Sequence, residues 1–264
     1  MNTNPKGKSK ATVQLMMMAF CFLMIVLLVI IMGKMSRASK PDYENAKLVQ
    51  RNVPSANDTV AVFETTKGTF KAVIYEDEAP EICKYFKDLV KQGYYDGTYV
   101  FGVEKDVYFL GGSKAADGND TQDTDTTTFD KELSPNLWPF KGSLISYGGK
   151  DNKFFSSNVS GSRIMFVNSV EFDDEMNKSL DSAGNKDVNK VFKELGGVPN
   201  FAQQYTIFGQ VYDGFDCYEK ICAAGEGDSS TIVPTEEIKI TKVTLSTYGE
   251  NKNDSFFADS SESK

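Results

Sequence analysis

Short segments of strand character recur along the chain beyond residue 59. In residues 59–77, TVAVFETTKGTFKAVIYED, apolar and polar side chains alternate on both sides of the TTKG sequence, which is the pattern of two half-buried strands joined by a tight turn. Further segments of strand character are TYVFGV, VYFLGG, GSLISYG, SRIMFV, YTIFGQVY and EEIKITKVTLST. So many antiparallel strands with few helices between them favour a closed barrel. We therefore predict a mainly β fold.

Three segments have the spacing of helices instead. Residues 79–93 place apolar side chains on one face between Pro80 and Gly93, and residues 214–225 indicate a second, shorter helix. A third helix is expected within residues 185–197. Its apolar face would consist of Val188, Val191, Phe192 and Leu195.

An apolar segment near the N-terminus predicts a membrane anchor. Leu15–Met32 are eighteen consecutive apolar residues, and a helix of this length spans about 27 Å, close to the thickness of a hydrocarbon core. We predict a cytoplasmic tail at 1–12 and a transmembrane helix at 13–33, with a cleaved signal peptide as the alternative. The short tail before the anchor favours a single-pass protein of the cell membrane whose folded domain lies outside.

The remaining segments divide the chain by composition. Residues 34–58 are polar with two prolines and suggest an extended linker, and the folded domain is expected at 59–248. Residues 249–264 are polar and acidic, which predicts a disordered tail.

Charge and residue counts exclude several classes of function. Beyond residue 40 there are 23 basic and 37 acidic residues, a net charge of −14, so nucleic acid is not an expected partner. The chain has no histidine, which removes histidine-dependent nucleophiles, general bases and metal sites. The four cysteines lack zinc-site spacing and are interpreted as reduced structural thiols. We predict neither a metal nor a cofactor.

The order of motifs from residue 60 to residue 247 resembles the cyclophilin family of peptidyl-prolyl isomerases. This resemblance implies an eight-stranded antiparallel barrel capped by two helices, and proline-containing segments as partners. The motifs that carry it are ETTKGTFKAVIYEDEAPEICKYFKDLVKQGYYDGT, FLGG, FDKEL, GSLISY, SGSRIMFV and YTIFGQVYDGFD.

The resemblance also implies a reaction and a missing catalytic group. Rotation about an X-Pro bond needs an apolar pocket for the ring and a donor to the imide nitrogen, whose lone pair becomes available as the bond twists. In the family this donor is the arginine of an F-H-R-V motif, which falls on residues 100–103 and becomes Gly102. The glutamine before the glycine pair becomes Leu110. We therefore expect an isomerase or foldase of reduced activity, with a catalytically silent peptide-binding domain as the alternative.

The other family positions supply the candidate site residues. A second family glutamine becomes Arg163, which is either a relocated catalytic donor or a surface arginine beside an inactive groove. On the first interpretation, any remaining catalysis depends on Arg163. The predicted substrate-binding residues are Val107, Tyr108, Met165, Phe201 and Tyr205, although the apolar ones could be ordinary core and the tyrosines could simply cover the groove.

Two further expectations concern the surroundings of this site. An insertion at about residues 169–200 replaces a short loop of the family, and it either forms a wall of the groove or only packs on the barrel. With the domain outside the membrane, the expected partners are proline-containing segments of exported or cell-surface proteins.

Overall fold

The computed structural model describes residues 44–119, 127–147, 160–182, 185–226 and 232–257. Among these residues, no helix combines the length and the apolar character needed to cross a bilayer. The predicted tail 1–12 and anchor 13–33 lie outside the described residues.

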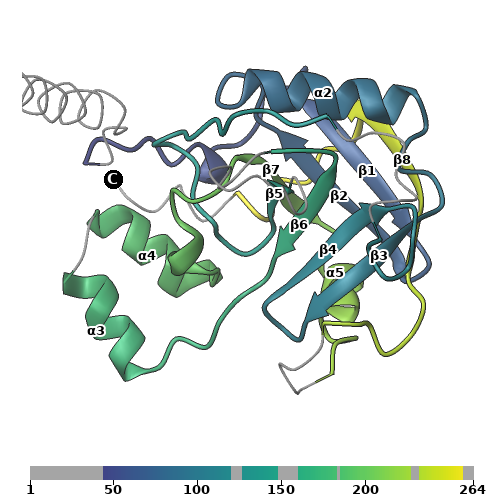
Figure 1. Ribbon diagram of the computed structural model, residues 1–264. Coiled ribbons are helices and arrows are strands. Elements are labelled where there is room, and N and C mark those ends of the chain that lie inside the picture. Colours follow the sequence, from purple (N-terminus) through teal and green to yellow (C-terminus); the bar gives the residue numbers. More distant parts are fainter. Residues whose placement is uncertain (1–43, 120–126, 148–159, 183–184, 227–231, 258–264) are drawn as a thin grey trace, which may run out of the picture. The chain divides into compact units, whose positions relative to one another are not determined.

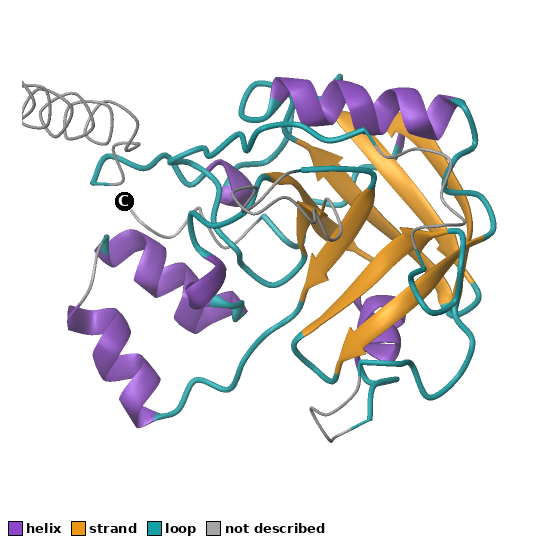
Figure 2. Ribbon diagram, viewed as in Figure 1, coloured by secondary structure: helices purple, strands orange, loops and turns teal. Residues whose placement is uncertain are grey.

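Eight antiparallel strands close into a barrel, as Figures 1 and 2 show. Their order around the barrel is β1-β2-β7-β5-β6-β4-β3-β8, so the predicted closed eight-stranded fold is confirmed. The strands are β1 (Thr59–Thr65), β2 (Gly68–Ile74), β3 (Thr98–Glu104), β4 (Tyr108–Ser113), β5 (Ser143–Tyr147), β6 (Arg163–Val167), β7 (Ile207–Asp213) and β8 (Lys239–Thr247).

Two helices lie at opposite ends of the barrel, as the resemblance implied: α2 (Pro80–Lys91) and α5 (Phe215–Cys222) (Figure 1). Both turn an apolar face inward, and these side chains join the barrel interior in one hydrophobic core. The barrel interior itself is filled mainly by aromatic rings. Among them are Phe63, Phe70, Phe109, Phe166 and Phe208.

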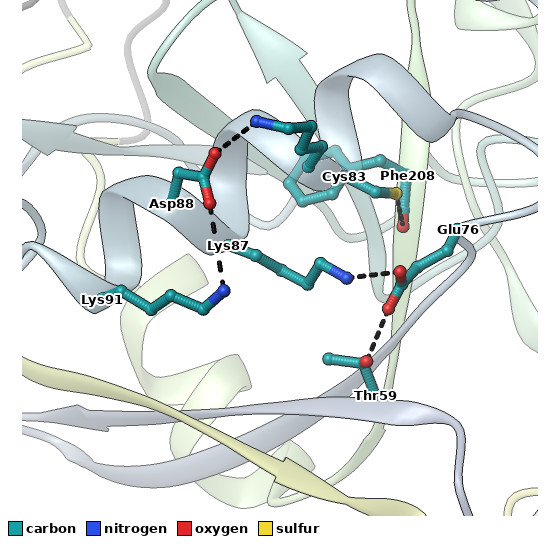
Figure 3. A network of polar contacts seen from close by, with 8 residues as sticks. Thr59, Glu76, Cys83, Lys87, Asp88, Lys91 and Phe208 are labelled. Carbon is teal, nitrogen blue, oxygen red and sulfur yellow. Dashed lines mark hydrogen bonds and ion pairs between the residues drawn. The ribbon is translucent and has the colours of Figure 1, made fainter.

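Polar contacts fasten α2 to the barrel (Figure 3). The Lys87 ammonium pairs with the Glu76 carboxylate, which also accepts a hydrogen bond of 2.6 Å from the Thr59 hydroxyl. The Cys83 thiol donates to the Phe208 carbonyl over 3.7 Å, and burial raises its pKa well above the ordinary value. The cysteines in the described part of the chain are all free and buried: Cys83, Cys217 and Cys222.

The insertion contains two helices, α3 (Asp174–Ser182) and α4 (Lys186–Leu195). The predicted helix is α4, which begins after Asn185, whose side chain accepts hydrogen bonds from two backbone amides of the first turn. The two helices share a small core with Trp138 and Phe140, and the Phe140 and Phe192 ring centroids are 4.7 Å apart. These helices therefore pack on the segment that precedes β5.

The linker prediction is wrong for the part of residues 34–58 that the structure describes. Gln50 is fully buried, and its side-chain amide donates to the Trp138 carbonyl, the Ser143 hydroxyl and the Gln210 side chain over 2.9–3.0 Å. Its side-chain oxygen accepts a hydrogen bond of 2.7 Å from the Trp138 amide. A buried glutamine is stable when its donors and its acceptor are satisfied. The segment around Gln50 therefore belongs to the folded domain.

The disordered-tail prediction is likewise wrong for residues 249–257. Phe257 is fully buried, with its ring centroid 5.7 Å from that of Tyr212 and 6.0 Å from that of Tyr248. Phe256 stacks on Phe215 at 5.7 Å. Two aromatic side chains bury enough apolar surface to order a segment whose other residues are polar. Residues 258–264 lie outside the described part.

Candidate peptide-binding face

A second hydrophobic cluster lies on the outer side of the barrel, separate from the core. Successive side chains of a strand point to opposite faces of the sheet. The side chains of β4 and β6 that point away from the barrel interior therefore lie next to one another. The strand registers pair Leu110 with Met165, and Met165 with Ile145. We call this group the outer cluster. Its buried members are Phe101, Leu110, Leu137, Ile145, Met165, Val167, Val198 and Ile207.

The structure brings all five predicted substrate-binding residues together at the outer cluster. Met165 is a buried member, 5% exposed, whereas Val107, Tyr108, Phe201 and Tyr205 are half-buried and pack against it. The ring centroids of Tyr108 and Phe201 are 5.9 Å apart, and those of Phe201 and Tyr205 are 5.5 Å apart. These three rings therefore form a row, which we call the aromatic row. That this row binds substrate remains a prediction.

The hydroxyl of Tyr108 stays protonated at neutral pH. Burial is the largest cause that raises its pKa, and the nearby Glu104 carboxylate raises it further. Glu104 lies opposite Tyr108 in the β3–β4 hairpin, on the same face of the sheet. Tyr108 can therefore act as a hydrogen-bond donor to a bound carbonyl group.

Gly102 lies under a side chain that the motifs did not reveal. A Cβ atom at this position would be 2.9 Å from Cδ1 of Ile232 and 3.2 Å from Cδ1 of Leu110. The backbone of Ile232 is fixed here, because its carbonyl accepts a hydrogen bond of 2.7 Å from the Val103 amide. Apolar side chains therefore occupy the space that a larger residue at position 102 would need.

Arg163 is a buried residue, 6% exposed, so its interpretation as a surface arginine is wrong. Its Nη1 atom donates to the Gly118 carbonyl over 2.9 Å, and its guanidinium lies 4.9 Å from the centroid of the Phe101 ring. Both contacts favour burial of an arginine. The carbonyl accepts a hydrogen bond from the guanidinium, and a planar guanidinium stacks well on an aromatic face. In this arrangement Arg163 binds the chain's own loop, and its catalytic role remains a prediction.

The ends of the insertion reach the outer cluster although its helices do not. Val170, before α3, packs against the cluster, and Val198, after α4, is one of its buried members. Phe201 follows in a short 3-10 helix, Pro199–Phe201. Phe201 is the first residue beyond the insertion, so this ring of the aromatic row lies directly after the insertion's C-terminal end.

Comparison with known proteins identifies the family. Residues 60–245 match the family model described as "Cyclophilin type peptidyl-prolyl cis-trans isomerase/CLD". This chain belongs to the cyclophilin family. A protein of Staphylococcus saprophyticus, itself predicted to be a peptidyl-prolyl cis-trans isomerase, is 26% identical to this cyclophilin over 192 residues, 72% of this chain and 93% of its own. A counterpart in Staphylococcus aureus is 28% identical over 177 residues, 64% of this chain and 87% of its own.

Solved structures agree with the cyclophilin fold. A crystal structure of a cyclophilin-type isomerase from Cryptosporidium parvum aligns with a TM-score of 0.53 at 20% identity, covering 72% of this chain and 98% of that one. A second structure of that protein, determined in the presence of the dipeptide Ala-Pro, aligns with a TM-score of 0.52 at 20% identity, covering 71% of this chain and 99% of that one.

The candidate face of this cyclophilin is mainly apolar. Proline isomerisation uses no nucleophile and no metal, and the described residues contain no group of three or more cysteines, aspartates or glutamates placed to hold a metal ion. Val107 and the aromatic row, which pack on the buried outer cluster, keep part of their apolar surface accessible. A twisted imide nitrogen accepts a hydrogen bond, but Gly102 has no side chain to donate one. The Ile232 side chain covers this position.

Proposed function

We propose that this cyclophilin binds proline-containing segments at the outer cluster and isomerises them slowly. One observation carries the proposal: the five predicted substrate-binding residues lie together at the outer cluster, while the arginine position is a glycine covered by Ile232. The crystal structure determined with Ala-Pro supports a proline ligand for a protein of this fold. Slow turnover follows because holding the ring lowers the barrier less than stabilising the twisted bond does.

A second candidate is a catalytically silent domain that only binds proline peptides. The contacts of Arg163 with Gly118 and Phe101 favour it, because they engage the cation that could have replaced the missing arginine. The rate of cis–trans exchange of an X-Pro peptide separates the two candidates. A slow isomerase accelerates exchange measurably above the spontaneous rate, whereas a silent domain binds the peptide and leaves the rate unchanged.

We also propose that residues 13–33 anchor the protein in the cell membrane, with the domain outside and exported or cell-surface proteins as its substrates. The apolar run Leu15–Met32 and the short segment before it support this arrangement. Protease added to intact cells is expected to digest the domain. Full protection in intact cells combined with digestion after lysis would reverse the orientation.

A further inference from the structure

Lys131 lies in a segment whose backbone is fixed on both sides. Two residues before it, Phe129 pairs with Ser160 through two backbone hydrogen bonds of 2.9 Å. Directly after it, the Glu132 amide donates to the Thr206 hydroxyl over 2.9 Å. Thr206 is the neighbour of Tyr205 in the sequence, so this bond holds Lys131 beside one end of the aromatic row.

Glu132, the acidic residue that follows Lys131 in the sequence, already has other partners. The Glu132 carboxylate accepts hydrogen bonds of 3.0 and 2.9 Å from the backbone amides of Glu81 and Ile82, in the first turn of α2. A carboxylate at a helix N-terminus is stabilised by the unpaired amides and the helix dipole. Glu132 therefore serves α2, and it forms no ion pair with Lys131.

The Lys131 ammonium lies over the Tyr205 ring, 5.5 Å from its centroid. The side chain is half-buried, and among the residues that the structure describes it forms no hydrogen bond or ion pair. Burial lowers the pKa of Lys131, and no charged neighbour contributes to this shift. A partly desolvated cation without a counterion gains free energy when an anion binds beside it.

We propose that Lys131 is a specificity residue of the peptide face and selects proline segments that carry a glutamate or aspartate within two residues of the proline. This inference rests on the proposed peptide binding at the outer cluster. A peptide lying along the row of Tyr108, Phe201 and Tyr205 brings an acidic side chain to the Lys131 ammonium at the Tyr205 end. The lysine contacts the substrate's side chain and takes no part in rotation of the bond.

The test measures the affinity of the full chain for fluorescent peptides built on an alanine host with one central proline. Glutamate is placed in turn at each of the two positions on either side of the proline, and each peptide is compared with its glutamine counterpart. At one position or more, the glutamate peptide is expected to bind about tenfold more tightly, the effect of one charge-assisted hydrogen bond at a partly exposed site. The preference is expected to weaken as salt is added.

Three variants locate the preference. Lys131→Gln is expected to abolish it while leaving the affinity for the glutamine peptides within about twofold, and Lys131→Arg is expected to keep it. Lys242→Gln is the matched control, because it removes the same charge at an exposed position of β8 and should leave the preference intact. Equal binding of glutamate and glutamine peptides by the unmodified chain would overturn the inference, as would a preference that survives Lys131→Gln.

A separate peptide distinguishes this inference from the proposed function. In it, alanine replaces the central proline of the glutamine host. If the alanine and proline peptides bind equally well, the proposed function fails. If only the proline peptide binds, and glutamate adds nothing at any position, the function stands and the role of Lys131 fails.

Discussion

Replacing Gly102 by arginine and Ile232 by alanine in the same chain is expected to raise the isomerisation rate about 100-fold, the usual effect of one preorganised donor of about 3 kcal/mol. The backbone of Gly102 does not have the positive φ that restricts a position to glycine, so a side chain is sterically allowed there. Gly102→Arg alone is expected to gain less, because Cδ1 of Ile232, 2.9 Å from the new Cβ atom, must first move aside. The measurement is kcat/KM for an X-Pro peptide.

Two further variants serve as controls for this restoration. Ile232→Ala alone opens the space without adding a donor and should keep the original rate. Arg163→Gln, added to the restored protein, should change the rate less than twofold, because Arg163 is bound to the Gly118 carbonyl and the Phe101 ring. A folded, peptide-binding double variant with no gain in rate would show that the missing arginine is not what limits catalysis. A tenfold loss on Arg163→Gln would show that Arg163 also takes part in catalysis.

Gln50→Ala is expected to lower the free energy of unfolding by about 3 kcal/mol. The truncation leaves the buried Trp138 amide without the side-chain oxygen that it donates to, and it removes three hydrogen bonds to Trp138, Ser143 and Gln210. Leaving a buried polar group without a hydrogen-bond partner costs more free energy than removing the partner of an exposed polar group. Urea denaturation of the full chain measures the change.

The matched variant is Gln204→Ala, which removes an exposed glutamine side chain of the same size. It should change the free energy of unfolding by less than about 0.5 kcal/mol. If both variants unfold at the same urea concentration, the segment around Gln50 does not belong to the cooperative unit that contains the barrel.

The barrel could be predicted because its signals are local. Alternation of side chains along β1 and β2, and the glycine-containing turn between them, fall within nineteen residues of sequence, 59–77. The helices α2 and α4 were equally visible, because each carries a full apolar face. By contrast α3 was missed, since Leu180 is its only buried residue and leaves almost no periodic signal.

Long-range contacts could not be predicted in the same way. Gln50 occurs in a polar stretch typical of a linker, and its partners Trp138 and Gln210 lie 88 and 160 residues further along the chain. Ile232 belongs to no motif, and only the structure places it over Gly102. The candidate face was predicted better, because family positions identified five residues that do lie together, from Val107 to Tyr205. Their role in binding awaits experiment.

The isomerisation rate of the unmodified full chain is the most direct test of slow catalysis by this cyclophilin. Exchange of an X-Pro peptide between its cis and trans forms is followed by NMR with and without the protein, beside a cyclophilin that retains the arginine. We expect acceleration above the spontaneous rate, with kcat/KM about 100-fold below that of the comparison enzyme, because Gly102 supplies no donor. A rate equal to that of the arginine-containing cyclophilin would contradict this expectation.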